Sequence, residues 1–329
     1  MTVVEHNGRM SSRPALQFPE GKRFAFTILD DTDDATVDNV RPIYSLLRSL
    51  GFRTTKTAWP LDCPEGSRKF FAAETLQNAE YLAFVRQLVA DGFELAFHGA
   101  TMESSHRERT IAGLEFIDRE IGAPMSVYCN HGQNRENLYW GADRYRTAML
   151  RLPLQVAGRA LRKPTYYGHV PQSPYFWGDI AKERFRFVRN FAFATLNQAR
   201  IHPVGPYRLR STPYVNYWFN TADAPDVHAF KRLVTPEGLE ALEQEGGVCI
   251  LSTHLGKGFV RDGRVDPDVE RTLRYLADRP GWFVPTSRLL EHLLRVAPGG
   301  ELSAREQWAL ELRHFFDRLN NRLHRDNTK

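Results

Sequence analysis

Apolar and polar residues alternate along the chain in a repeated strand-then-helix order. Residues 23–29, RFAFTIL, are predicted to form a buried strand, and residues 37–50 a helix that Thr36 caps and Gly51 ends. Further strands are predicted at 53–59, 93–98, 125–131, 186–195, 248–254 and 281–286. Further helices are predicted at 73–92, 104–122 (capped by Ser104 or Ser105), 236–247, 266–280 and 287–296. This alternation favours an α/β fold with a parallel sheet, either a barrel or a doubly wound sheet.

The regular order breaks in the middle of the chain. The segment from Trp140 to about Arg210 is rich in Pro, Gly, Arg and aromatic residues, and we expect it to be a long excursion from the scaffold. We therefore predict an N-terminal extension (1–20), one barrel domain (21–298) that contains a basic and aromatic excursion (141–210), and a C-terminal amphipathic helix (299–329). The apolar face of that helix must pack on the barrel or on another subunit, which would make a homo-oligomer.

The length and composition fit one large core. The chain has 329 residues, of which 42% are hydrophobic. The N-terminus lacks the apolar stretch of a secretory signal, and no apolar run approaches the roughly 18 residues that span a bilayer, so we expect a soluble, cytoplasmic protein. Cys63, Cys129 and Cys249 are odd in number and widely spaced, which predicts free thiols rather than disulfides or a Cys-rich zinc site.

The positive charge is concentrated in the predicted excursion. Residues 141–210 hold 13 Lys or Arg against 3 Asp or Glu, a net charge of +10, so that the remainder of the chain carries −5 of the total +5. A basic segment interleaved with aromatic residues could bind an anionic sugar, a nucleotide-sugar diphosphate or a lipid-linked pyrophosphate; it could equally be a solvated surface. No nucleic-acid-binding motif is present, so nucleic acid is not an expected partner.

Polar residues follow several predicted strands at the point where each strand ends. They are Asp30, Asp31, Asp33 and Asp34 after the first strand, His98 after the third, Asn130 and His131 after the fourth, and His254 after a late one. Chemistry collects at the carboxyl ends of parallel strands, so we expect one shared site. Carboxylate and imidazole together suit a divalent metal ion such as Zn²⁺.

These segments resemble the polysaccharide deacetylase superfamily (carbohydrate esterase family 4, the NodB-homology domain). TILDDT is similar to the first motif of that family, FELAFHGATM to part of the second, and CILSTHLG to the last. The resemblance covers about residues 20–295 and implies a distorted (β/α)7-type barrel. It also implies that Asp30 is a general base, that Asp31 and His98 bind the metal, and that His254 is a general acid.

The chain departs from the family pattern at the second metal-binding histidine, where it has Met102. Thioether is a poor ligand for such an ion, so another side chain must complete the site. We favour His131, because neighbouring strand ends converge in a barrel; His106 and Asp33 are the alternatives. By the same resemblance, Arg135 could replace the arginine of the third motif, and Asn130, His169 and Trp177 would join it in binding substrate.

The resemblance implies metal-dependent N- or O-deacetylation of a sugar. The variant motifs DDTDD and NHGQN are closest to deacetylase-like proteins of bacterial O-antigen or other surface-polysaccharide assembly, whose substrates could be nucleotide-linked or lipid-linked precursors. Two other hypotheses stay open. One is a carbohydrate-binding relative that has lost its metal, and the other is a metal-free barrel that uses paired carboxylates as glycosidases do.

Overall fold

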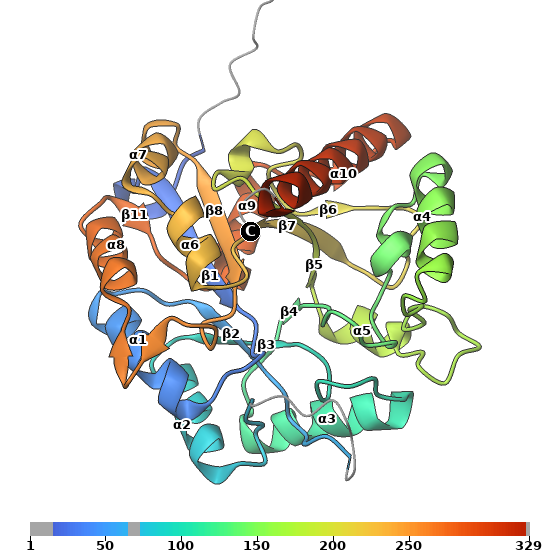
Figure 1. The fold of residues 1–329 in the computed structure, drawn as a ribbon, viewed down its shortest axis with the longest axis horizontal. Helices are drawn as coiled ribbons and strands as arrows, with labels where there is room; N and C mark the ends of the chain where they lie inside the picture. The colour runs from blue at the N-terminus through green and yellow to red at the C-terminus, as the bar shows by residue number, and fades with distance from the viewer. Residues whose placement is uncertain (1–15, 65–72, 327–329) are drawn as a thin grey trace, which may run out of the picture.

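Seven parallel strands close into a barrel (Figure 1). The computed structural model describes residues 16–64 and 73–326, and side chains as far as residue 320. The barrel strands, in spatial order, are β1 (Phe24–Asp30), β2 (Thr55–Ala58), β3 (Glu94–Phe97), β4 (Val127–Tyr128), β5 (Phe187–Phe193), β7 (Tyr217–Asp223) and β8 (Val248–Thr253), which pairs with β1 again. The fold is therefore the predicted α/β barrel of the (β/α)7 type.

Helices surround the barrel (Figure 1). They are α1 (Val37–Ser49), α2 (Ala79–Ala90), α3 (Arg107–Glu120), α5 (Gly178–Arg184), α6 (Val227–Leu233), α7 (Pro236–Gln244), α8 (Pro267–Ala277) and α9 (Thr286–Val296). Thr36 caps α1 as predicted, because its side chain accepts a hydrogen bond from Asn39 N. The predicted side-chain cap of α3 is wrong: its N-cap residue is His106, which makes no capping hydrogen bond. Within the described residues, no helix combines the length and the apolar character that crossing a lipid bilayer requires.

The predicted excursion is shorter than 141–210, because β5 belongs to the barrel. The segment between β4 and β5 contains a 3-10 turn, η2 (Gly141–Arg144), and the helices α4 (Ala148–Ala160) and α5. After β5, a second 3-10 turn, η3 (Gln198–Arg200), and the short β6 (Tyr207–Arg208) lead into β7, to which β6 is antiparallel. The predicted N-terminal extension lies outside the described residues up to residue 15.

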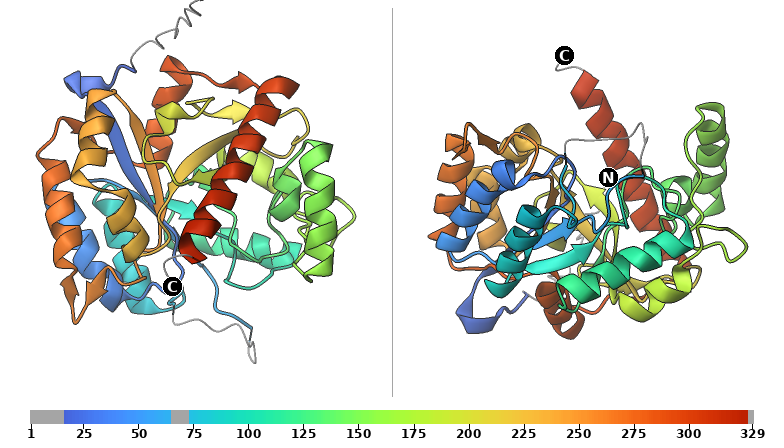
Figure 2. Two further views of the ribbon diagram at one scale, coloured as in Figure 1. Left: turned by 45° about the horizontal axis from the view of Figure 1, so that its top comes forward. Right: turned by 90° about the horizontal axis from the view of Figure 1, so that it is seen from below.

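The C-terminal segment packs on the barrel. A short strand, β12 (Gly300–Glu301), pairs with β6, and α10 (Ala304–Asp326) then runs diagonally across the molecule (Figure 2). Glu311 on α10 accepts hydrogen bonds from the backbone N–H groups of Arg146 and Thr147, and the ring of His314 stacks on Phe191 of β5. The remaining elements are the 3-10 turn η1 (Pro19–Gly21), the hairpin β9 (Val260–Arg261) and β10 (Arg264–Val265), and β11 (Gly281–Trp282) beside β1.

Side chains of β1 alternate between the helix-facing side and the barrel interior. Phe26 and Ile28 belong to the core beneath the surrounding helices, whereas Ala25 and Leu29 belong to the core inside the barrel. Asp30 follows the first set, and its carboxylate is buried at an ion pair with Lys56 of β2 (2.9 Å). All three cysteines are free thiols, as predicted: Cys129 and Cys249 are buried and Cys63 is partly exposed.

Replacement of Lys56 by Met should lower the free energy of unfolding by about 3–5 kcal/mol, because it leaves a buried carboxylate without its cation. Urea denaturation measures this loss. Arg41→Met is the matched control, since the Arg41–Glu80 pair is exposed and should contribute at most about 1 kcal/mol. A loss for Lys56→Met as small as that of the control would contradict the structural role of the pair.

His169 in the excursion provides a pH-dependent contribution to stability. Its Nδ1 accepts a hydrogen bond from the backbone N–H of Tyr139 (3.1 Å), so the ring is neutral. Burial, with Arg146 adding to it, lowers the pKa of His169 to about 4. Between about pH 6.5 and pH 4, the His169 ring therefore binds a proton in the unfolded chain but not in the folded one. The free energy of unfolding must consequently fall as the pH drops from 6.5 towards 4.

The variant His169→Asn keeps a hydrogen-bond acceptor but does not titrate. We expect the stability advantage of the unchanged protein over this variant to shrink by about 2–3 kcal/mol between pH 7.5 and pH 4.5. Urea denaturation of both proteins across this range measures the difference. Parallel pH curves would show that the His169 ring is protonated as easily in the folded state as in the unfolded one.

Candidate metal and active site

Four barrel strands deliver the candidate site at their carboxyl ends. Asp31 and Asp33 lie in the loop after β1, His98 directly follows β3, His131 follows β4, and His254 follows β8. Because β8, β1, β2, β3 and β4 are consecutive neighbours in the barrel, these residues from distant parts of the sequence meet above one end of it. The predicted convergence of strand ends is therefore present in the structure.

Each of the three histidines is held through its Nδ1 atom by an oxygen acceptor. The acceptors are the Cys129 carbonyl for His98 (2.9 Å), the Asn134 side-chain oxygen for His131 (3.1 Å) and the Pro225 carbonyl for His254 (2.7 Å). An oxygen acceptor requires Nδ1 to carry the proton, so in the neutral ring the lone pair is on Nε2. Hydrogen bonds of this kind fix the tautomer and orientation of metal-binding histidines.

The three Nε2 atoms point at one carboxylate, that of Asp33. His98 Nε2 lies 3.5 Å from Asp33 Oδ1, and the Nε2 atoms of His131 and His254 each lie 3.6 Å from Asp33 Oδ2. Lys257 Nζ is also 3.6 Å from Oδ2. Ligand atoms of Asp33, His98 and His131 all lie within 4.8 Å of one another, close enough to share a metal ion.

The charge distribution of the cluster also suits a cation. Asp33 Oδ1 is buried and makes no hydrogen bond within the described part of the chain, so this carboxylate oxygen is available to a metal ion. Burial would raise the pKa of Asp33, but the facing imidazoles of His131, His254 and His98 lower it far below its ordinary value. Asp33 is therefore ionised, and it faces imidazole nitrogens that can act as metal ligands. The donor set fits a divalent metal ion.

Asp31 lies inside the barrel beside this cluster and pairs with an arginine. Arg189 of β5 contacts both carboxylate oxygens of Asp31, at 2.8 and 3.0 Å, and His98 Nδ1 lies 3.8 Å from Asp31 Oδ1. Burial would raise the pKa of Asp31, but Arg189, His98 and His254 hold it below its ordinary value. The structure thus presents Asp31 as a buried, ionised carboxylate that faces the imidazoles but is already paired with a cation.

Asp30 occupies a different environment from the one that a general base requires. Its oxygens accept hydrogen bonds from Lys56 Nζ (2.9 Å), Tyr44 Oη (2.8 Å) and the backbone N–H of Leu255 (2.7 Å). The side chain is fully buried and lies on the helix-facing side of β1. The assignment of Asp30 as general base therefore needs correction, since the carboxylate is turned away from the histidines and already bonded.

The residues predicted to bind substrate prove to be structural or exposed. Asn130 is buried, and its amide bonds both the N–H and the C=O of Leu138. Trp177 is fully buried and donates from Nε1 to the Glu136 carbonyl (2.6 Å). Arg135 is exposed, and its guanidinium lies 5.9 Å from the centre of the Tyr175 ring. His169 binds the Tyr139 backbone, as described above.

The positions of the alternative residues show which of them could serve as the further metal ligand. His106 is the N-cap residue of α3, and its ring contacts Tyr175 instead of the cluster. Met102 is buried in the loop after β3. His131 does reach the cluster, together with Asp33, which sequence reasoning had only as a third option.

The sequence analysis did not predict three charged residues near the site: Lys56, Arg189 and Lys257. Lys56 and Arg189 stand in the middle of strands, in TKTA and FVRNFAF. A lone basic residue within a buried strand must find an anionic partner, and this signal could have indicated both ion pairs. Lys257 lies in the loop three residues after His254, where the sequence offers no comparable signal.

Comparisons with known proteins support the fold. No protein-family model matches the chain, and no curated protein matches it. Among solved structures, the chain is similar to PuuE allantoinase (13% identity, TM-score 0.54) and to a protein of Pseudomonas aeruginosa PAO1 described as a "probable polysaccharide deacetylase" (12% identity, TM-score 0.54). In both cases the alignment covers 88% of this chain and 97% of the other. At this identity the likeness is one of fold, and it extends over 88% of the chain.

Proposed function

We propose that this protein is a metal-dependent deacetylase that removes an acetyl group from a sugar of a bacterial surface polysaccharide or of its precursor, such as O-antigen. The observation that carries the proposal is the convergence of three oriented imidazole Nε2 atoms on the Asp33 carboxylate. The motif resemblance supports an acylated sugar as the substrate, and one of the two structures of similar fold is described as a probable polysaccharide deacetylase.

Asp33, His98 and His131 would hold the metal ion, which we propose to be zinc. Two imidazoles and one carboxylate are a common ligand set for catalytic zinc, with further positions left for water and substrate. A zinc ion there would supply Lewis-acid polarisation of the acyl carbonyl and would acidify water. The Asp33 oxygen that lacks a hydrogen bond within the described residues supports its role as ligand, in place of Asp31.

The remaining groups of the cluster would move protons. Asp31, ionised and held by Arg189, would accept the proton of the attacking water. His254 would donate a proton from Nε2 to the departing amine or hydroxyl; its Nδ1 is fixed by the Pro225 carbonyl. Burial would lower the pKa of His254, but Asp33 and Asp31 raise it above its ordinary value, which favours the protonated form of an acid. Lys257 adds a positive charge beside the reacting groups.

Replacement of Asp33 by Asn should abolish zinc binding, because the only carboxylate of the ligand set is lost. Protein stripped with a chelator, reloaded with zinc and dialysed should retain about one equivalent when unchanged and less than about a tenth in the variant, as elemental analysis measures. Hydrolysis of 4-nitrophenyl acetate should fall to background in parallel.

Asp34→Asn is the matched control for this experiment. Asp34 is the next residue, has a left-handed backbone (φ 60°) that Asn tolerates, and lies outside the proposed ligand set. Equal zinc contents in Asp33→Asn and in the unchanged protein would contradict the ligand assignment. An unchanged protein that takes up no zinc, nickel, cobalt, manganese or iron would instead favour the metal-free carbohydrate-binding alternative.

Replacement of His254 by Gln should separate proton donation from metal binding. We expect zinc content to be retained and acetate release from N-acetylglucosamine oligomers to fall by about 10²–10⁴-fold, since an amine leaves poorly without a proton. Hydrolysis of 4-nitrophenyl acetate should fall much less, because 4-nitrophenolate leaves unassisted. The exposed His228→Gln is the control. Equal losses on both substrates would mean that His254 does not act as the acid.

A further inference from the structure

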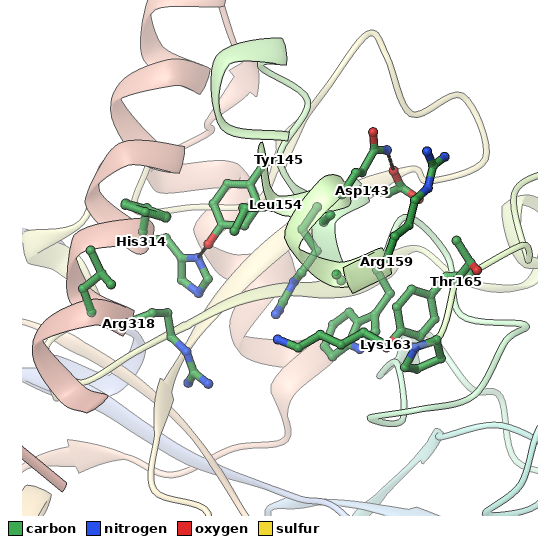
Figure 3. A pocket seen from close by; sticks show the side chains of 18 residues that line it. Asp143, Tyr145, Leu154, Arg159, Lys163, Thr165, His314 and Arg318 are labelled. Carbon is green, nitrogen blue, oxygen red and sulfur yellow. Dashed lines mark hydrogen bonds between the residues drawn. The ribbon is translucent and has the colours of Figure 1, made fainter. Parts of the chain in front are cut away.

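A cavity of about 320 Å³ lies between the excursion and the C-terminal helix (Figure 3). Its walls are η2 and the residues next to it, the inner side of α4, the segment Lys163–Tyr166 and the stretch of α10 from His314 to Leu319. None of these residues belongs to the histidine and aspartate cluster. The walls combine aromatic rings, those of Trp140, Tyr145, Tyr166 and Phe315, with basic side chains.

The charges that line this cavity are predominantly positive. Four cationic side chains, Arg144, Arg159, Lys163 and Arg318, stand against one carboxylate, Asp143, which gives a net +3. Asp143 is already engaged by Gln155 (2.9 Å). Lys163 and Arg318 extend toward one another from opposite walls (Figure 3), although Arg318 also contacts Asp223 at 3.0 Å. Cationic side chains gathered around one cavity repel one another unless an anion offsets their charge.

Arg144 is the side chain that most needs such an anion. Its Nε is buried and makes no hydrogen bond within the described residues, and no carboxylate of that part of the chain forms an ion pair with it. The guanidinium donates to the Asn190 carbonyl and lies 3.8 Å from the centre of the Trp140 ring. Burial lowers the pKa of Arg144 to about 10. An unpaired, desolvated guanidinium gains strongly from an anionic ligand.

The cavity adjoins the proposed metal site through one peptide group. Trp140 Nε1 (2.9 Å) and Tyr166 Oη (3.1 Å), both in the cavity wall, donate hydrogen bonds to the carbonyl oxygen of Gly132. Gly132 directly follows His131 in the sequence. A ligand that fills the cavity would therefore contact two side chains that are hydrogen-bonded to the residue next to a proposed metal ligand.

We propose that this cavity binds a phosphate or diphosphate group. A phosphate presents several acceptor oxygens and close to two negative charges, which matches a net +3 better than a single carboxylate does. Arg144 and Arg318 would bind its oxygens through their planar guanidinium groups, and Lys163 and Arg159 would close the open side.

The phosphate could come from a nucleotide-linked or a lipid-linked sugar. Aromatic walls suit a nucleotide, whereas the outer side of α4 exposes Met149, Leu152 and Val156 beside the cavity, which suits a lipid. The shared chemistry is the phosphate. That this phosphate belongs to the acylated sugar rests on the proposed function; anion binding itself does not.

Isothermal titration with inorganic pyrophosphate tests the proposal, in metal-free Asp33→Asn protein with EDTA so that no bound metal takes part. The double variant Lys163→Met/Arg159→Met changes two exposed side chains and should weaken binding at least about tenfold. Arg162→Met, exposed and adjacent to Lys163 but outside the cavity, should change it less than about threefold. Arg144 is left intact because it also donates to the Asn190 carbonyl.

Sedimentation with phosphatidylglycerol vesicles, and with phosphatidylcholine vesicles as control, forms the second arm. Pyrophosphate binding that the double variant weakens supports a free or nucleotide-borne phosphate. Binding only to the phosphatidylglycerol vesicles, lost in the double variant, supports a lipid-borne phosphate. Absence of both, or binding equally strong in the double variant and in Arg162→Met, overturns the proposal. Zinc retention by the unchanged protein is measured separately, so either proposal can fail alone.

Discussion

Two buried ion pairs at the end of β1 determine where the site can form. Lys56 holds Asp30 on the helix-facing side of the strand, and Arg189 holds Asp31 in the barrel interior. Each pair is almost completely removed from water, so either partner alone would be a desolvated charge in a medium of low dielectric. Because successive residues of a strand point to opposite sides, the two pairs also fix the twist of the chain as it enters the following loop. The path of the chain after these two pairs then sets the position of Asp33 in the loop.

Much of the fold follows from local pattern. Residues 24–30, 94–97 and 248–253 are short apolar strands, and the helices between them bury one face, so the strand-then-helix order is readable from the sequence. The pattern alone left a barrel and a doubly wound sheet open. The elements that were missed include α4, α5, α6 and β7. α4 contains Pro153 and Gly158, which normally end or weaken a helix, and it has no buried residue to reveal an inward face. β7 lies directly after a stretch rich in Tyr, Pro and Asn, and it joins the barrel only through its neighbours.

The sequence predicted where the candidate site lies, but not which residue would take each proposed role in it. Polar residues that end parallel strands must converge, and the three histidines do. Which aspartate faces them depends on the residue at which β1 stops and on Arg189, which lies 158 positions away in the sequence. Such a pairing has no local signature. Motif order therefore assigned the base to Asp30 and the ligand to Asp31, whereas the roles that we propose from the geometry lie further along the loop, at Asp31 and Asp33.

The source of the second imidazole has a structural consequence. The family that the motifs resemble takes both metal-binding histidines from the loop after one strand. This chain has Met102 in that loop, and the second imidazole of the proposed site is His131, which follows the neighbouring β4. His131 begins the segment whose Gly132 carbonyl anchors Trp140 and Tyr166. An ion held by His131 and an anion held against those two rings would thus order the same short segment, and whichever binds first would lower the entropic cost of binding the other.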